Sequence, residues 1–112
     1  MITITNGFLS GWTGIYIGRK WKDKNRSPLA NPYSVEQYGR DRCIDMYKKW
    51  LWSAILEKRE PTYSFLKQLV NKYRNKEDIQ LDCFCYPKKC HGEIIKLAIE
   101  YLGDDNNNWR LS

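Results

Sequence analysis

The sequence predicts an α/β fold in which three helices pack on a small sheet of about three strands, as a Rossmann-like layered domain. Two observations predict it. Short runs of β-branched and apolar residues are interleaved with longer stretches of helical periodicity, in the order ββααβα. The chain has 112 residues, of which 42% are hydrophobic. This length and composition suit one globular core, and the chain is too short for two.

The three expected strands are short. Ile2 to Thr5 alternates apolar and polar residues, and Gly14 to Gly18 is an apolar run bracketed by glycines. Ile79 to Cys85 places its apolar residues and cysteines on one face. Asn6-Gly7 and Ser10-Gly11 are turn signals between the first two strands.

Three helices are expected from apolar residues at helical spacing. The first is capped by Asp41 and runs to about Lys58, and the second runs from about Thr62 to Asn75. The third runs from about Cys90 to Leu102, with Gly103 as its C-cap. The core face expected for this last helix consists of Ile94, Leu97, Ala98 and Tyr101. We therefore expect one domain over residues 1–103 and a polar tail over residues 104–112.

The stretch from Leu81 to Ile95 contains a strand end, a basic turn and a helix start. Three of the four cysteines and the only histidine of the chain lie within it. Backbone N–H groups and the positive end of the helix dipole collect at such a helix start, which favours an anion such as phosphate. If the second and third strands are parallel, Arg19 and the turn from Pro87 to His91 lie at the same edge of the sheet, where ligands of open α/β sheets bind.

Cys90-His91-Gly92 supplies the first candidate site residues. The helix dipole and the neighbouring lysines would lower the pKa of a thiol at Cys90. His91 is suited to donate to a phosphate or to act as an acid or base near neutral pH. Gly92 would let a ligand approach the backbone closely. The structural alternative is that Cys90 caps the helix and His91 satisfies a neighbouring carbonyl.

Arg19, Asn31 and Arg40 are the other candidate ligand-binding residues. A guanidinium group is a planar fork that matches phosphate or carboxylate, although either arginine can equally be a surface ion-pair partner. Asn31, held between two prolines, can present its amide to a base or ribose. It can also bond its own backbone as a turn residue.

The chain resembles a family of small bacterial and phage proteins, domain of unknown function 4326, from about Tyr16 to Leu102. The segments that carry this resemblance are Tyr16-Ile17-Gly18-Arg19, Pro28-Leu29-Ala30-Asn31-Pro32, Arg40 seven residues before Tyr47, Trp50-Leu51, Cys83-Phe84-Cys85-Tyr86-Pro87 and Cys90-His91-Gly92. The family usually has glycine where this chain has Ala30 and Asp82, so the turn at Ala30 should not need a positive φ. The resemblance implies a compact α/β fold with a polar pocket, and no settled activity.

The net charge of +6 favours an anionic partner. Together with the candidate residues, it predicts binding of a small phosphorylated or nucleotide-like ligand without a cofactor. A phage protein of this kind could sequester a nucleotide signal of its host. The sequence shows neither the pattern of a signal peptide nor an apolar run long enough to span a membrane, so a cytoplasmic protein is expected.

Four alternatives remain open. Cys90 or His91 could act chemically in an enzyme that processes a nucleoside or nucleotide. The basic loop from Lys20 to Arg26, which includes Trp21, could bind nucleic acid or a protein. An exposed Trp52 would mark a contact within a homo-oligomer. Finally, a zinc ion could be held by four residues, Cys83, Cys85, Cys90 and His91, although two of these cysteines also suit a buried strand face.

Overall fold

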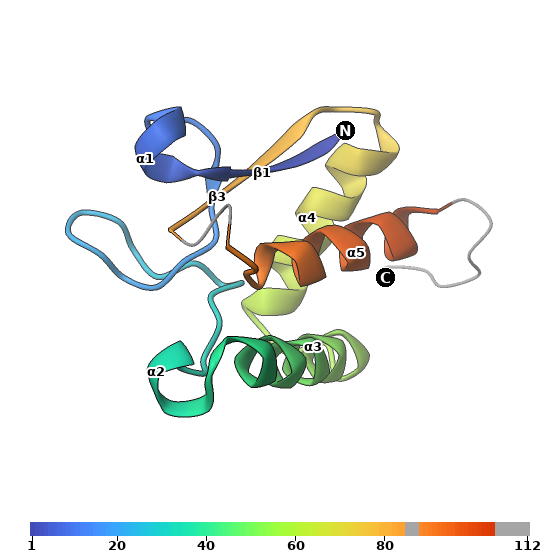
Figure 1. Cartoon of the computed structure of the whole chain (residues 1–112). Helices are drawn as coiled ribbons and strands as arrows, with labels where there is room; N and C mark the ends of the chain where they lie inside the picture. The colour runs from blue at the N-terminus through green and yellow to red at the C-terminus, as the bar shows by residue number, and fades with distance from the viewer. Residues whose placement is uncertain (85–87, 105–112) are drawn as a thin grey trace.

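The computed structural model describes residues 1–84 and 88–104. Over these residues the chain is a small mixed α/β domain with a three-stranded parallel sheet and five helices (Figure 1). The predicted strand end at Cys85, and the predicted tail beyond Asp104, lie outside the described residues.

The elements follow one another in the order β-α-β-α-α-α-β-α. Their bounds are β1 (Ile2–Asn6), α1 (Gly7–Ser10), β2 (Ile15–Tyr16), α2 (Val35–Tyr38), α3 (Arg40–Leu56), α4 (Thr62–Arg74), β3 (Ile79–Cys83) and α5 (Gly92–Gly103).

β3 is the central strand of the sheet, whose order is β1-β3-β2. Ile4 of β1 and Ile15 of β2 are both in register with Leu81, and both pairings are parallel. The second and third predicted strands are therefore parallel, which was the condition for Arg19 and His91 to lie at the same edge of the sheet. The side chains of β3 alternate between faces, so Leu81 faces the main core while Asp82 faces the other side.

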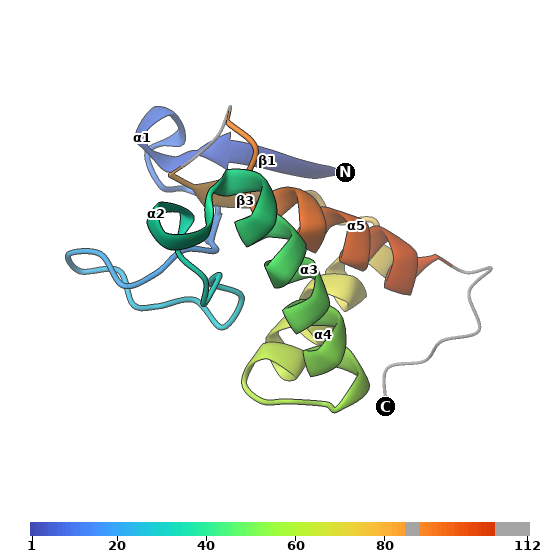
Figure 2. The ribbon, with the colours of Figure 1, turned by 60° about the horizontal axis from the view of Figure 1, so that its bottom comes forward.

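Helices α3, α4 and α5 lie on one side of the sheet, and α3 is the farthest from it (Figure 1). Turning the molecule brings α3 in front of α5 (Figure 2). Burial of their apolar faces against the sheet supplies the main stabilising contribution of the fold. The core between these layers includes Ile2, Ile17, Leu29, Tyr47, Leu51, Ile55, Leu66, Val70, Leu81, Ile95, Ile99 and Leu102.

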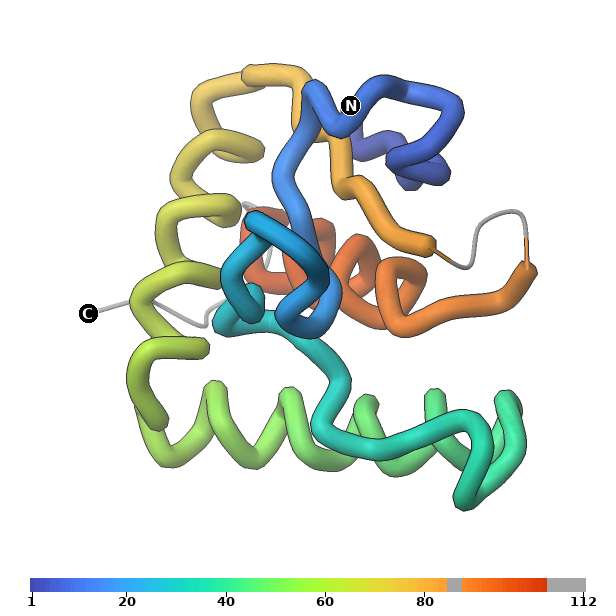
Figure 3. The backbone as a smooth tube through the Cα atoms, turned by 90° about the vertical axis from the view of Figure 1, so that its left-hand side faces the viewer, coloured from blue at the N-terminus to red at the C-terminus, as the bar shows by residue number. Residues whose placement is uncertain are grey.

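The segment after β2 runs down across the front of the helices to α2 and α3, as the tube in Figure 3 shows. Two hydroxyl groups fix this proline-containing stretch to the helices. Tyr47 Oη donates to the carbonyl of Leu29 at 2.7 Å, and Thr62 Oγ1 donates to the carbonyl of Pro28 at 2.8 Å. Ala30 has no positive φ, as expected. The buried Leu29 thus joins the core without regular secondary structure.

Replacing Tyr47 with phenylalanine should lower the free energy of unfolding by about 1–2 kcal/mol, because it leaves the buried Leu29 carbonyl without its donor. Tyr63 offers a matched control: its hydroxyl is buried and has no hydrogen-bond partner among the described residues. Tyr63→Phe should therefore change stability by less than about 0.5 kcal/mol or increase it. Urea unfolding of both variants measures the difference, and equal losses would contradict the assignment.

Two short helices were not predicted. The turn signals at Asn6-Gly7 and Ser10-Gly11 instead bound α1: the Asn6 side chain accepts from the backbone N–H of Phe8, and Gly11 ends the helix with φ 72°. In α2, Ser34 accepts from the backbone N–H of Gln37. Ser34 and Gln37 have the spacing of a capping box, which is the sequence signal for α2.

The ends of the long helices differ slightly from expectation. α3 begins at Arg40 after Gly39, so Asp41 lies in the first turn and is not the cap. α5 begins at Gly92 and includes Gly103, and Asp104 is its C-cap. The regular part of β2 is also shorter than the predicted strand.

The expected core face of α5 was wrong in part. Leu97 and Tyr101 are 58% and 56% exposed, whereas Ile95 and Ile99 are fully buried. α5 is apolar on more than one side, so its periodicity fits either face.

Trp52 is half-buried, not exposed, and its ring meets that of Tyr101 edge-on at 5.5 Å.

Among the described residues, no helix is long and apolar enough to cross a membrane.

Candidate functional site

A cavity of about 520 Å³ lies where the chain leaves the carboxyl ends of β2 and β3. Its walls come from the segment after β2, from α2 and the start of α3, and from the residues on either side of the strand-to-α5 connection. It is lined by Gly18, Arg19, Lys20, Trp21, Asn31, Tyr33, Ser34, Val35, Glu36, Arg40, Cys43, Ile44, Cys83, Phe84, Lys89, Cys90 and His91. Five of the six predicted site residues therefore line one cavity.

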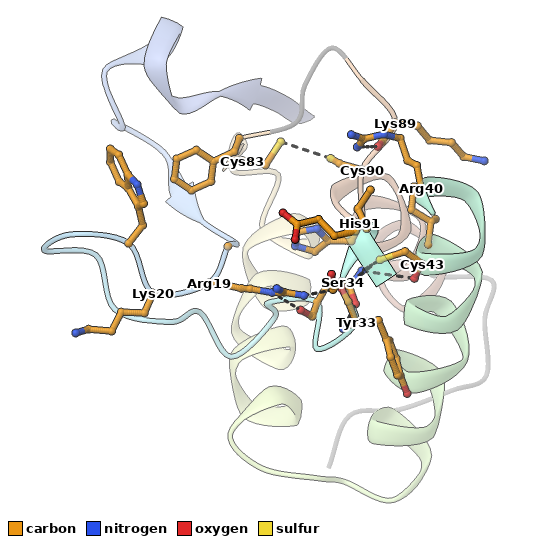
Figure 4. Close-up of a pocket in the computed structure, with 17 residues that line it drawn as sticks. Arg19, Lys20, Tyr33, Ser34, Arg40, Cys43, Cys83, Lys89, Cys90 and His91 are labelled. Carbon is orange, nitrogen blue, oxygen red and sulfur yellow. Dashed lines mark hydrogen bonds between the residues drawn. The ribbon is translucent and has the colours of Figure 1, made fainter. Parts of the chain in front are cut away.

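Arg19 lines the cavity and also fixes its wall (Figure 4). Its Nε donates to the carbonyl of Asn31 at 3.1 Å, and its Nη2 donates to the carbonyl of Tyr33 at 2.6 Å. These bonds hold the chain on either side of Pro32 against the end of β2. They use two of the five N–H donors of a guanidinium group.

Asn31 is buried, with both ends of its amide bonded inside the protein. Its Oδ1 accepts from the backbone N–H of Tyr33 at 2.9 Å, and its Nδ2 donates to Cys43 Sγ at 3.1 Å. The first bond is the turn geometry that was the structural alternative for this residue. Asn31 therefore shapes the wall and connects it to α3.

Arg40, the first residue of α3, reaches the segment that precedes α5. Its Nη1 donates to the carbonyl of Lys89 at 2.8 Å. The Lys89 ammonium in turn lies 3.4 Å from Asp41 Oδ1. The start of α3 is thus tied to the chain just before Cys90, and the Arg40 guanidinium closes that side of the cavity (Figure 4).

His91 Nε2 lies 2.6 Å from the carbonyl oxygen of Ile17, at the end of β2. Since a carbonyl only accepts, Nε2 is the donor, which leaves Nδ1 as an acceptor in the neutral ring. Burial lowers the pKa of His91 to about 4; the bond to Ile17 opposes this shift and the nearby Arg19 charge adds to it. His91 is therefore uncharged at neutral pH, and its bond to Ile17 is the contact with a neighbouring carbonyl that was the structural alternative for this residue.

Cys83 and Cys90 face each other at the end of β3, with 3.4 Å between their sulfur atoms (Figure 4). Both side chains are buried. The distance is that of a thiol contact and too long for a disulfide bond. Within residues 1–84 and 88–104, no group of three or more histidine, cysteine or acidic residues could hold a metal ion. Cys85, one of the four residues considered for zinc, lies outside those residues.

Gly92 is absent from the cavity wall and is buried under the sheet. A Cβ atom at this position would lie 3.1 Å from Ile17 Cδ1 and 3.3 Å from Ile4 Cγ2. The glycine therefore lets α5 approach the strands closely. The structure gives it this packing role in place of the expected approach of a ligand.

The charge around the cavity is positive, since Arg19, Lys20, Arg40 and Lys89 face a single acidic residue, Glu36, in its lining. Figure 4 shows Lys20 extending away from the other labelled residues, and the Lys89 ammonium is paired with Asp41, so the two arginines are the remaining positive charges of the lining. Glu36 was not among the predicted site residues. The Ser-x-x-Gln signal of α2 would have placed it in the first turn of that helix, two residues after the Ser34 cap.

The basic loop from Lys20 to Arg26 contains a tight turn. Trp21 and Lys24 exchange two backbone hydrogen bonds, of 3.0 and 2.8 Å, around Lys22 and Asp23. Lys22 Nζ lies 4.5 Å from the centre of the Trp21 ring, which is a cation–π distance. Contacts of Trp21 with Lys22 and Lys24 therefore order the loop, and Trp21 itself lines the cavity.

A family model described as Domain of unknown function (DUF4326) matches residues 5–101 of the chain. No curated protein and no solved structure gives a significant match. The matched range includes every residue that lines the cavity.

Proposed function

The chain belongs to the family of domain of unknown function 4326, and we propose that its cavity binds a small phosphorylated or nucleotide-like ligand. The observation that carries the proposal is the presence of two arginines, Arg19 and Arg40, in the lining of one cavity at the carboxyl end of a parallel sheet. Guanidinium groups bind phosphate through paired N–H donors. The cavity volume of about 520 Å³ lies within the usual range for small-molecule sites.

The position of the cavity supports the same ligand class. Open α/β sheets bind ligands outside the carboxyl ends of their strands, and a Rossmann-like arrangement around β1, β3 and β2 would present this edge to the nucleotide. α5 starts beside the cavity, so its dipole adds to the field of the arginines. The proposal extends to a cytoplasmic phage protein that sequesters a nucleotide signal of its host.

Arg40→Ala should weaken binding of the phosphorylated ligand at least about tenfold, because a hydrogen bond to a charged group contributes about 1.5–3 kcal/mol. Arg42→Ala is the matched control. It removes the same charge from the same helical turn, but Arg42 lies over the Tyr38 ring and outside the cavity lining. Calorimetric titration with inorganic phosphate, ribose 5-phosphate, AMP and UMP measures the effect in both variants.

In the wild-type protein, a ligand at about 100 times its Kd should raise the melting temperature by about 10 °C. No rise with any of the four compounds would overturn the proposal. Equal weakening in Arg40→Ala and Arg42→Ala would remove the cavity as the site, since only general charge would then explain binding.

The alternative of an enzyme receives less support from the same geometry. His91 is uncharged at neutral pH and its Nε2 is bonded to Ile17, while Cys90 is buried beside Cys83. Binding without turnover agrees better with these contacts.

A further inference from the structure

Five aromatic rings form a cluster outside the main core, near the carboxyl ends of the strands. The ring of Phe84, the residue after β3, contacts the other four at centroid distances between 4.9 and 5.9 Å. The members of this aromatic cluster are Phe8, Trp12, Tyr16, Trp21 and Phe84. They come from α1, β2 and three connecting segments, so their meeting is a product of the fold.

Two members of the aromatic cluster, Trp21 and Phe84, also line the cavity. Trp21 is fixed before any ligand binds. Its backbone is held by the two hydrogen bonds to Lys24, and its ring contacts Phe8, Trp12 and Phe84. A rigid aromatic wall loses little side-chain entropy on binding. Phe8, Trp12 and Tyr16 do not line the cavity, so their packing against one another accounts for them. Trp21 also lines the cationic cavity, and packing alone does not require an aromatic residue there.

The cavity thus combines two chemistries. Arg19 and Arg40 suit a phosphate group, whereas aromatic rings suit a flat, weakly polar group. Neither phosphate nor a simple sugar phosphate has such a group, and a nucleobase does. Bases stack on tryptophan and phenylalanine side chains with little dependence on their identity.

We propose that the ligand is a nucleotide whose base stacks on the wall formed by Trp21 and Phe84 while its phosphate is bound by Arg19 and Arg40. This inference rests on the proposed function and narrows it from phosphorylated compounds in general to nucleotides. Because stacking discriminates weakly among bases, AMP and UMP should both bind.

The test compares ligands that share the phosphate and differ in the base. AMP and UMP should bind the wild-type protein at least about tenfold more tightly than ribose 5-phosphate. Trp21→Leu should remove this advantage while leaving the affinity for ribose 5-phosphate within about twofold. Trp21→Phe should keep most of it, since the aromatic face remains.

Trp12→Leu is the matched control, because it removes an indole from the same aromatic cluster at a position that does not line the cavity. It should preserve the nucleotide advantage. An equal loss in Trp12→Leu and Trp21→Leu would overturn the stacking assignment. If Trp21→Leu does not fold, the wild-type ligand comparison and Trp21→Phe still decide the question.

The two proposals fail differently. Equal affinity for ribose 5-phosphate, AMP and UMP would overturn the nucleotide inference and leave phosphate binding intact. No binding of any phosphorylated compound would overturn both.

Discussion

Asp82→Ala is expected to lower the free energy of unfolding by about 3–5 kcal/mol and the melting temperature by about 10 °C or more. Asp82 is fully buried in the central strand β3. Its Oδ1 accepts from Thr5 Oγ1 at 2.5 Å and from Gln80 Nε2 at 3.0 Å, and its Oδ2 accepts from the backbone N–H of Gly14 at 2.8 Å. Alanine removes the acceptor of all three donors at once, in a place where water does not replace it easily.

Burial raises the pKa of Asp82, but the hydrogen bonds from Thr5, Gln80, Gly14 and Ser10 outweigh burial and leave the pKa lowered. The carboxylate is therefore charged in the folded protein at neutral pH. It connects β1, β3 and the chain before β2 on the face opposite the helices.

Asp82→Asn is the informative companion variant. It keeps the shape of the side chain but replaces one acceptor oxygen by an NH₂ group. This NH₂ group would face the N–H donor of Gly14 or of Gln80, and one of the two donors would have to rotate away. The loss should be smaller than for alanine, about 1–3 kcal/mol. Urea unfolding followed by circular dichroism measures both variants. A loss below about 1 kcal/mol in Asp82→Ala would show that the carboxylate does not hold these segments together.

The burial of Asp82 could not be predicted from the alternation of residues in the sequence. Alternation along the third strand identified the buried face of Ile79, Leu81 and Cys83 correctly. The same alternation places Asp82 on the opposite face, and it gives no sign that this face is buried, because Gly14, which covers Asp82, comes from a connecting segment. Burial on that side is produced by tertiary contacts, which no local period encodes.

In the candidate site, too, some features could be predicted from the sequence and others could not. Parallel strands place their carboxyl ends together, so the convergence of Arg19 and His91 followed from the order of elements. The hydrogen-bond partners of these two side chains could not be predicted from the order of elements. Arg19 and His91 bind backbone carbonyls at Asn31, Tyr33 and Ile17, and the path of an irregular loop is not fixed by residue type.

Acidification is expected to destabilise the protein between about pH 6.5 and pH 4 through His91, the only histidine of the chain. The folded protein keeps this ring uncharged until about pH 4, whereas an unfolded chain protonates it near pH 6.5. Between these values the unfolded state binds more protons, so the free energy of unfolding falls as the pH falls. The loss approaches about 3 kcal/mol at pH 4.

Because there is a single histidine, its C2 proton signal in an NMR titration reports this pKa directly and should have its midpoint near pH 4. His91→Gln is the control, since a glutamine amide can still donate to the Ile17 carbonyl but does not titrate. Unfolding by urea at pH 5 and pH 6.5 should show a pH dependence in the wild type that is absent in His91→Gln. Asp82 contributes little between pH 5 and pH 6.5, since its pKa is lowered in the folded protein and an unfolded aspartate titrates near pH 3.9. A histidine midpoint near pH 6.5 would mean that the ring is open to solvent and that Ile17 does not hold it in the cavity wall.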